Sequence, residues 1–167
     1  MSRRLLRLET PVFPDRKMFR LHDATVDPNG SGSPLPPMGA LVSVTREQIW
    51  IGSLQENLGV HLTLEEWDSA PPPFGDEWED EAKAVLYLRG ALSVDMGSAG
   101  RAVDRLKLAS GVGDYVVRVY ARGRRDAVRL YSELFQRGLD PLSDDFGQAR
   151  KSLEGHEQYL VQLWRGT

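Results

Sequence analysis

The chain has 167 residues, which suits a single domain, residues 1–167, with a substantial core. Its 21 lysines and arginines against 24 aspartates and glutamates leave a formal charge of −3, which gives no overall attraction to nucleic-acid phosphates or anionic membranes. The sequence contains no cysteine, which excludes disulfides, thiol catalysis and cysteine metal ligands. The apolar run in "MSRRLLRLETPVF" breaks at Arg7 and Glu9, and no stretch approaches the roughly 18 apolar residues of a membrane span. We therefore expect a cytoplasmic protein without membrane contact.

The first extended segments lie near the amino terminus. In "KMFRLH", Phe19 and Leu21 share one face of an extended segment. A turn-rich connector, "DPNGSGSPLPPMG", follows at 27–39. In "LVSVTREQIWIG" the apolar residues change parity partway along, and one straight strand would then turn half of its apolar set outward. We therefore predict a bulge or bend within 45–48.

Alternating apolar and polar residues predict further strands along the chain. "GVHLTLE" places Val60 and every second residue after it on one face, and "AKAVLYLRGALSVDM" supplies one long strand or two joined at Gly90. "LKL" at 106–108 resembles the first arm of a hairpin that leads into Tyr115. The closing "YLVQLW" is almost continuously apolar, which is typical of a strand covered on both faces.

The clearest strand is "GDYVVRVYARG", residues 113–123. Its odd-numbered residues from Tyr115 to Ala121 are apolar or aromatic and share one face, whereas Arg118 and Arg122 lie on the other. This alternation is typical of a half-buried antiparallel strand. We expect its arginine face to be wet.

Two helices are predicted before the closing strand. Asp126 is a suitable N-cap for a helix at 126–137, where apolar residues recur at the spacing of one helical face. A second helix is predicted from Ser143, as its cap, to Leu153. We expect the two to form a helical insertion at about 126–153 that packs on the strands.

The combined elements predict a mainly β fold. About seven short strands separated by turn signals are typical of an antiparallel β-sandwich, here jelly-roll-like, with the small helical insertion added. Residues 1–39 are expected to supply amino-terminal strands and the Pro/Gly-rich connector.

Acidic and aromatic residues are concentrated in "EEWDSAPPPFGDEWEDE". One interpretation is a solvated loop whose rings fold back to anchor it. The other is a partner-binding surface, because aromatic rings contribute contact energy and acidic groups steer a basic partner. The carboxylates lack the spacing of a calcium loop, so we predict no metal site. The candidate partner-binding residues are Glu65, Glu66, Trp67, Asp68, Asp76, Glu77, Trp78, Glu79, Asp80 and Glu81.

Basic residues gather in and after the clearest strand. An arginine on the wet side of a strand covers apolar surface with its stem or pairs with a neighbouring strand, and we expect mainly such solvated edges. The alternative is an anion patch, although the exposed aromatic rings on which single-strand binders stack bases are missing. We expect no direct contact with nucleic acid. The alternative anion patch comprises Arg118, Arg122, Arg124 and Arg125.

The three histidines form no zinc motif, because neither H-x-x-x-H nor H-E-x-x-H occurs. We predict no cofactor and no catalytic residue. A hydrolase that uses His22 or His61 as general base remains an alternative, since the fold rather than sequence spacing assembles a catalytic triad. It requires a carboxylate and a nucleophile within hydrogen-bond reach of the imidazole.

The order of four segments resembles a known family. "VSVTREQIWIG" is followed by "DEWEDEAKAVLYLRGALSVDMGS", by "GDYVVRVYARG" after a glycine turn, and by the closing "EQYLVQLW". This order is similar to that of the ComJ-type proteins and of a broader group of immunity-like bacterial proteins. The resemblance covers about 40–123 and 157–165, and leaves out the first forty residues and the helical insertion. It implies a competence-associated β-sandwich that inhibits a DNA-degrading nuclease.

These observations predict a non-enzymatic inhibitor or immunity-type protein. Its acidic aromatic segment would block a basic site on another protein, such as a nuclease or a toxin. Trp67 and Trp78 are the expected anchors, and Glu77, Asp80 and Glu81 the complementary charges.

The alternative function is a module that binds a small ligand or a carbohydrate. β-Sandwiches bind ligands on a concave face or among their loops. Clustering of Tyr120, Trp50 and Trp164 in an open groove would favour this function, and burial of all three rings would remove its main support.

Overall fold

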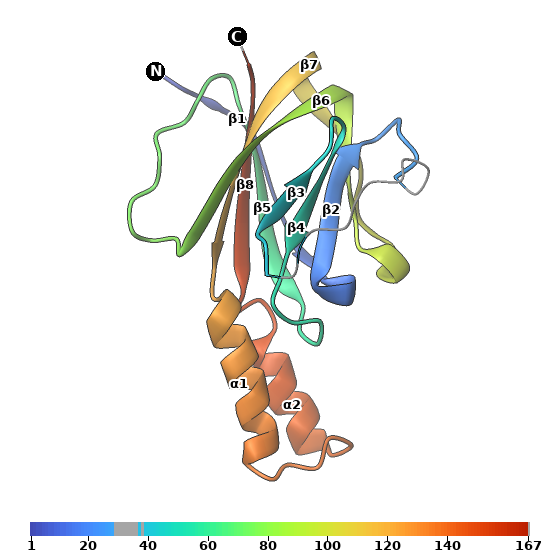
Figure 1. Ribbon diagram of the computed structural model, residues 1–167, viewed down its shortest axis with the longest axis vertical. Coiled ribbons are helices and arrows are strands. Elements are labelled where there is room, and N and C mark those ends of the chain that lie inside the picture. The colour runs from blue at the N-terminus through green and yellow to red at the C-terminus, as the bar shows by residue number, and fades with distance from the viewer. Residues whose placement is uncertain (29–36, 38, 167) are drawn as a thin grey trace.

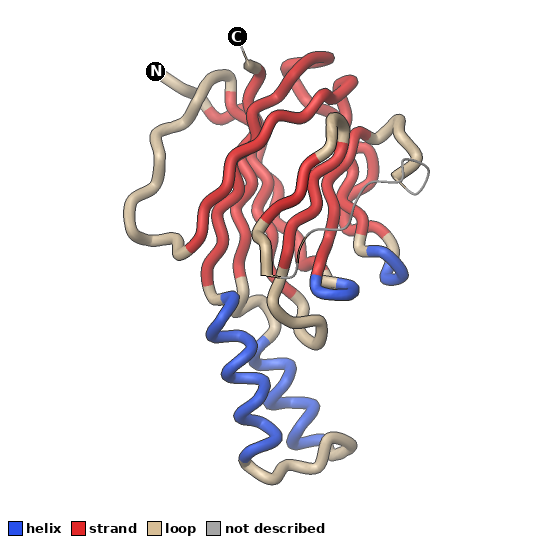
Figure 2. The backbone as a smooth tube through the Cα atoms, viewed as in Figure 1, coloured by secondary structure: helices blue, strands red, loops and turns tan. Residues whose placement is uncertain are grey.

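The computed structural model describes residues 1–28, 37 and 39–166, so most of the connector predicted at 27–39 lies outside the described residues. It shows a strongly curved sheet with a pair of helices that extends from one end (Figures 1 and 2). The helices of this part of the chain are α1 (Arg124–Gln136) and α2 (Asp144–Leu153), and its 3-10 turns are η1 (Asp15–Lys17) and η2 (Gly97–Ala99). The strands within the described residues are β1 (Arg4–Val12), β2 (Met18–Asp23), β3 (Val42–Val44), β4 (Gln48–Gly52), β5 (Val60–Trp67), β6 (Asp80–Asp95), β7 (Arg101–Arg122) and β8 (Gln158–Arg165).

These strands form one mixed sheet in the order β1-β5-β8-β7-β6-β2-β4-β3. β5 and β8 run parallel, and the other neighbouring pairs of the described sheet are antiparallel. The predicted mainly β class is therefore confirmed. The jelly-roll-like antiparallel sandwich is not confirmed, because the strands belong to one continuous sheet instead of two separate ones.

The sheet folds back on itself around a common core. Three strand steps separate β2 from β8, which would be about 14 Å in a flat sheet. The rings of Phe19 on β2 and Tyr159 on β8 nevertheless lie 5.2 Å apart, edge to face. The Tyr159 hydroxyl also donates a hydrogen bond of 3.0 Å to the carbonyl of Gly52 on β4. The two halves of the sheet thus face each other across the core.

The sheet bends within its two longest strands, β6 and β7. Residues 108–111 of β7 lie opposite Gly90 of β6 alone, so the hydrogen-bond ladder is interrupted there. Gly90 has a φ of 95°, a left-handed conformation that favours glycine. β6 is thus one long strand bent at Gly90, one of the two predicted arrangements. The predicted hairpin from 106–108 into Tyr115 is wrong, because both segments belong to the single bent strand β7.

Side chains supply the hydrogen bonds that this interruption removes. Glu66 of β5 is fully buried and accepts the backbone N–H groups of Ala109 and Ser110, each at 2.8 Å. Arg165 of β8 donates to the carbonyl of Ser110 at 2.9 Å. Glu66 therefore takes the place of a strand partner at the bend.

The change of parity predicted within 45–48 marks a hairpin turn. Val44 on β3 pairs with Ile49 on β4, and the N–H of Thr45 donates to the carbonyl of Gln48 at 2.9 Å. The predicted position of the bulge or bend is therefore correct, but the feature is a hairpin turn, because the chain reverses direction where the pattern changes phase.

Two of the predicted burial patterns are confirmed. The odd-numbered face of β7 from Tyr115 to Ala121 is fully buried in the core. β8 is buried on both faces from Tyr159 to Trp164. One face of β8 packs in the core, and on the outer face the guanidinium of Arg118 lies over the ring of Trp164.

The helices begin and end close to the predicted positions. α1 follows Gly123, and Asp126 lies in its first turn instead of capping it. Ser143 caps α2 as predicted, because its side chain accepts the N–H of Phe146 at 3.2 Å. Short-range signals thus located both helices.

The predicted packing of the helices on the strands is wrong. α1 and α2 extend beyond the end of the sheet as a hairpin between β7 and β8 (Figure 1). They contact each other through Tyr131, Phe135 and Phe146, with the two phenylalanine rings 5.2 Å apart. Arg150 of α2 also donates to the carbonyl of Asn57 at 3.3 Å, so the helical hairpin contacts the loop between β4 and β5. It does not cover a face of the sheet.

Replacing Gly123 with alanine is expected to destabilise the junction between β7 and α1. Gly123 has a φ of 77°, and a Cβ atom there would lie 2.6 Å from the carbonyl oxygen of His156. Gly123→Ala should lower the free energy of unfolding by more than about 1 kcal/mol in urea denaturation. Gly147→Ala in α2 is the control, because a Cβ atom there would meet no atom within 4 Å. This replacement should raise the free energy of unfolding by about 0.5–1 kcal/mol. Equal unfolding midpoints would contradict this account.

Removing one charge at the bend is expected to weaken the whole sheet. Glu66→Gln turns an amide NH₂ towards a backbone N–H, so the variant should lose about 1–3 kcal/mol of unfolding free energy. The exposed Glu77→Gln should change this free energy by no more than about 0.5 kcal/mol. Thermal and urea unfolding compare the two variants, and an equal loss in both would exclude the proposed role of Glu66.

Candidate partner-binding surface

Residues 68–79 connect β5 to β6, and we call them the acidic loop. The loop forms a wide arc beside β6 in Figure 1. Its rings rest on the outer face of the sheet, the face turned away from the core. The centroid of the Tyr120 ring on β7 lies 5.4 Å from that of Phe74 and 6.0 Å from that of Trp78. The guanidinium of Arg122 lies 4.4 Å from the centroid of the Trp78 ring.

The acidic loop covers the face of β7 that the sequence predicted to be wet. Arg118 is only 7% exposed and donates to the carbonyl of Pro71 at 3.3 Å. Its guanidinium also lies 5.0 Å from the ring centroid of Trp164 on β8. The expected solvated edge is therefore wrong for Arg118, and also for Arg124, which is buried at the start of α1.

Acidic and basic residues from the two predicted clusters pair with each other. β6 begins beside the end of β7 because the two strands are antiparallel neighbours. Asp80 consequently lies 3.4 Å from Arg124 and 3.6 Å from Arg125, and Glu81 lies 3.9 Å from Arg118. These contacts neutralise much of the charge that each cluster shows in the sequence.

Glu65 is buried on the outer face among hydrogen-bond donors. Burial alone would raise the pKa of Glu65, but the hydrogen bonds and the nearby positive charge outweigh it and hold the pKa below its ordinary value of 4.5. The carboxylate is thus satisfied within the protein. The donors are Arg7 at 2.8 Å, Trp67 and Gln162 at 3.0 Å each, and Arg4 at 3.2 Å.

The accessible part of the candidate surface is smaller than the sequence suggested. Asp68 and Glu79 each accept a backbone N–H from another segment. Asp76 and Glu77 are exposed and form no ion pair with any other described residue. Phe74 beside them is 40% exposed. The acidic loop therefore presents two free carboxylates and an apolar ring.

A shallow pocket of about 360 Å³ lies between the acidic loop and the outer face of the sheet. The position of β1 at this pocket was not predictable from local patterns, because pairing between β1 and β5 joins residues 48 to 63 positions apart. Trp78 and Arg122 hold the loop side of the pocket in place. The residues lining it include Arg7, Glu9, His61, Glu77, Trp78 and Arg122.

The histidines do not meet the geometric requirement of a hydrolase. His22 is fully buried, and this burial lowers its pKa despite the opposing effects of a backbone hydrogen bond and Asp95. His61 lies 3.5 Å from Glu9, but no described hydroxyl forms a hydrogen bond with its ring.

Among the described residues, no group of three or more histidines and acids is placed to hold a metal ion. No helix in that part of the chain is long and apolar enough to cross a membrane.

The three rings proposed for a ligand groove do not cluster. Tyr120 and Trp164 are buried, and both contact Arg118 on the outer face. Trp50 lies on β4, in the other half of the folded sheet. The alternative ligand module therefore lacks the ring cluster on which it was based.

Fold and surface together define a mainly β protein with one folded mixed sheet, a helical hairpin before its last described strand, and an acidic loop held on the outer face. No protein-family model matches the sequence, and no curated protein matches it. Two solved structures are similar. One is the crystal structure of ComJ from Bacillus subtilis, an inhibitor of the DNA-degrading activity of NucA. The other is described as crocagin biosynthetic gene J.

Both similarities extend over nearly the whole chain. The ComJ structure is 9% identical, with a TM-score of 0.55 and 99% of each chain covered. The crocagin structure is 13% identical, with a TM-score of 0.54, and the match covers 100% of this chain and 99% of the other. At these identities the likeness shows the fold. The predicted resemblance to ComJ is confirmed at that level, and it extends beyond residues 40–123 and 157–165.

The ionised form of Glu65 is expected to stabilise the protein in a pH-dependent way. Its folded pKa lies below 4.5, so the contribution is present above about pH 4.5 and is lost as the pH falls towards the folded pKa. Glu65→Gln should cost about 1–3 kcal/mol of unfolding free energy at pH 7, and less at pH 3. Urea denaturation at both pH values measures the difference. The more exposed Glu9→Gln is the control, and an equal loss for Glu65→Gln at both pH values would contradict the assignment.

Proposed function

We propose that this protein is a non-enzymatic inhibitor that binds another protein, a DNA-degrading nuclease, through the acidic loop. The observation that supports this most directly is the pair of uncompensated carboxylates, Asp76 and Glu77, beside the exposed ring of Phe74. The shared fold adds support, because ComJ inhibits the DNA-degrading activity of NucA.

The proposed mechanism is competition with DNA for a basic site. A nuclease binds the phosphate backbone with lysines and arginines, and much of its affinity for DNA comes from these charges. Two adjacent carboxylates present the same sign of charge, so they steer the loop towards that site and occupy it. Phe74 supplies an apolar contact that phosphate lacks, which favours the inhibitor over DNA.

The support beneath the acidic loop lowers the cost of binding. Ordering a flexible loop on association consumes part of the binding free energy. Here Trp78 is held between Tyr120 and Arg122, and the N–H of Phe74 donates to the Tyr120 hydroxyl at 3.3 Å. Trp78 therefore acts as the internal anchor of the loop.

The proposal narrows the set of charges predicted from the sequence. Glu77 remains in it, and Asp76 joins it as the second free carboxylate. Asp80 and Glu81 contribute less, because both already face arginines of this chain. Glu66 is buried at the bend and does not reach the surface.

Reversing the two free charges tests this function. The double variant Asp76→Lys/Glu77→Lys should weaken inhibition at least about tenfold, because attraction to the basic site becomes repulsion. The assay measures DNA degradation by each purified DNA-degrading nuclease of the source organism at increasing inhibitor concentration. Asp104→Lys/Asp114→Lys is the matched control, since it changes the net charge equally at exposed positions of β7.

The possible failures of this experiment have different meanings. Wild-type protein that inhibits none of the nucleases would contradict the inhibitor function itself. Inhibition that is equally strong in the wild type and the acidic-loop variant would leave inhibition standing but exclude the acidic loop as the contact surface.

A further inference from the structure

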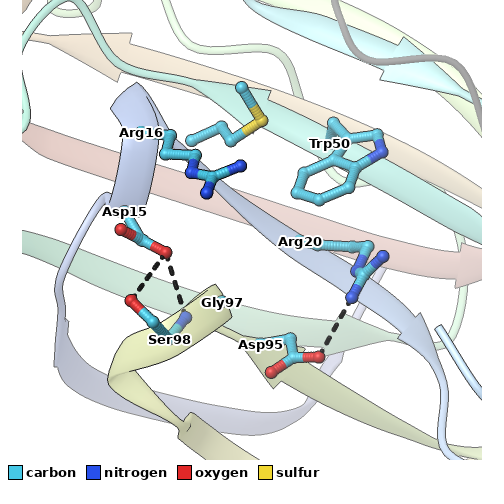
Figure 3. Close-up of a pocket in the computed structure, with 8 residues that line it drawn as sticks. Asp15, Arg16, Arg20, Trp50, Asp95, Gly97 and Ser98 are labelled. Carbon is cyan, nitrogen blue, oxygen red and sulfur yellow. Dashed lines mark hydrogen bonds and ion pairs between the residues drawn. The ribbon is translucent and has the colours of Figure 1, made fainter. Parts of the chain in front are cut away.

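A second pocket, of about 380 Å³, lies away from the acidic loop in the other half of the folded sheet. It forms where η1 and η2 meet β2, β4 and the end of β6. Figure 3 shows Arg16 and Trp50 on one side of this pocket, with Ser98 and Asp95 opposite them. The residues lining it include Asp15, Arg16, Arg20, Trp50, Asp95 and Ser98.

One wall of the pocket is flat and nearly neutral. The guanidinium of Arg20 stacks on the Trp50 ring, 4.5 Å from its centroid. The same guanidinium donates to Asp95 at 3.1 Å and to the carbonyl of Pro28 at 2.8 Å. Arg20 is only 5% exposed, so its position is fixed and Asp95 balances its charge. A planar group can stack on such a surface.

The rim of the pocket carries an exposed guanidinium, that of Arg16, next to a carboxylate. Arg16 is exposed and forms no ion pair with any other residue in the described ranges. The carboxylate next to it, on Asp15, already accepts both the N–H and the hydroxyl of Ser98 at 3.0 Å. The hydrogen-bond donors of the Arg16 guanidinium are therefore available to a ligand.

The backbone holds Arg16 in an unusual conformation at this rim. Its φ is 53°, and that of Lys17 is 66°, in the left-handed region that residues other than glycine rarely adopt. The contacts between Asp15 and Ser98 tie η1 to η2 and help to maintain this conformation. Strained backbone of this kind is characteristic of ligand-binding positions.

We propose that this pocket binds a small organic anion in which a carboxylate is attached to a flat ring. The ring packs on the surface that Trp50 and Arg20 form together. The carboxylate pairs with Arg16, whose planar fork of donors matches its two oxygens. The volume lies within the range of small-molecule sites. This binding activity is separate from the inhibitor function, because the pocket and the acidic loop share no residue.

Titration calorimetry on the full chain tests the proposal with benzoate and indole-3-acetate as probes. Both should bind, and the uncharged benzamide and indole-3-acetamide should bind at least about tenfold more weakly, because they cannot form the charged pair with Arg16. Inorganic phosphate, which has no ring, should also bind at least about tenfold more weakly than the two carboxylates.

Matched arginine variants locate the site. Arg16→Gln should weaken binding of both carboxylates at least about tenfold. Arg105→Gln should leave it unchanged, since Arg105 is an exposed arginine with a φ of 54° that lies outside the pocket. Trp50→Leu should weaken binding of the ring-bearing probes, and circular dichroism verifies that each variant is folded.

Three results would overturn the proposal. The first is failure of both carboxylates to bind the wild-type protein. The second is an equal effect of Arg16→Gln and Arg105→Gln. The third is phosphate binding as tight as that of benzoate, which would show a simple anion site with no role for the ring.

Discussion

The carboxylate of Glu66 satisfies the backbone where the sheet folds, and the rest of the architecture depends on this contact. An N–H group that is shielded from water and lacks an acceptor costs about 1–3 kcal/mol. β7 leaves the N–H groups of Ala109 and Ser110 without a strand partner opposite Gly90. Because Glu66 accepts both, β6 and β7 can bend without leaving them unpaired. The bend brings β2 and β4 over β8, which closes the core and leaves the outer face free for the acidic loop.

The positions of the acidic residues in the fold determine which of them contact other groups of this chain. Glu65 and Glu66 are adjacent in β5, so they point to opposite faces of the sheet, one into a network of donors and the other into the bend. Asp80, at the start of β6, lies beside arginines from the end of β7 and the start of α1. Among the described acids predicted to bind a partner, Asp76 and Glu77 at the tip of the acidic loop are exposed and form no ion pair, so their charge is available to another molecule.

Local patterns in the sequence predicted local structure well. The alternation around Tyr115 identified the buried face of β7, and Ser143 identified the start of α2. The neighbours in the sheet were not predictable, because a period of two reports which face is buried and not which strand lies alongside. For the same reason the burial of Arg118 was missed, since Pro71, which contacts it, lies 47 residues earlier in the chain. The pocket at Arg16 brings together three separate segments, which no single motif records.

The position of β8 has a consequence for how the protein folds. β8 comes last among the described strands in chain order, yet it lies between β5 and β7. Until it arrives, the β1–β5 pair and the long β6–β7 hairpin are separate pieces, each with an open edge that invites pairing with other chains. A folding intermediate in which β8 is not yet paired is thus more prone to aggregate than the folded sheet, and insertion of β8 is the step that joins the two pieces.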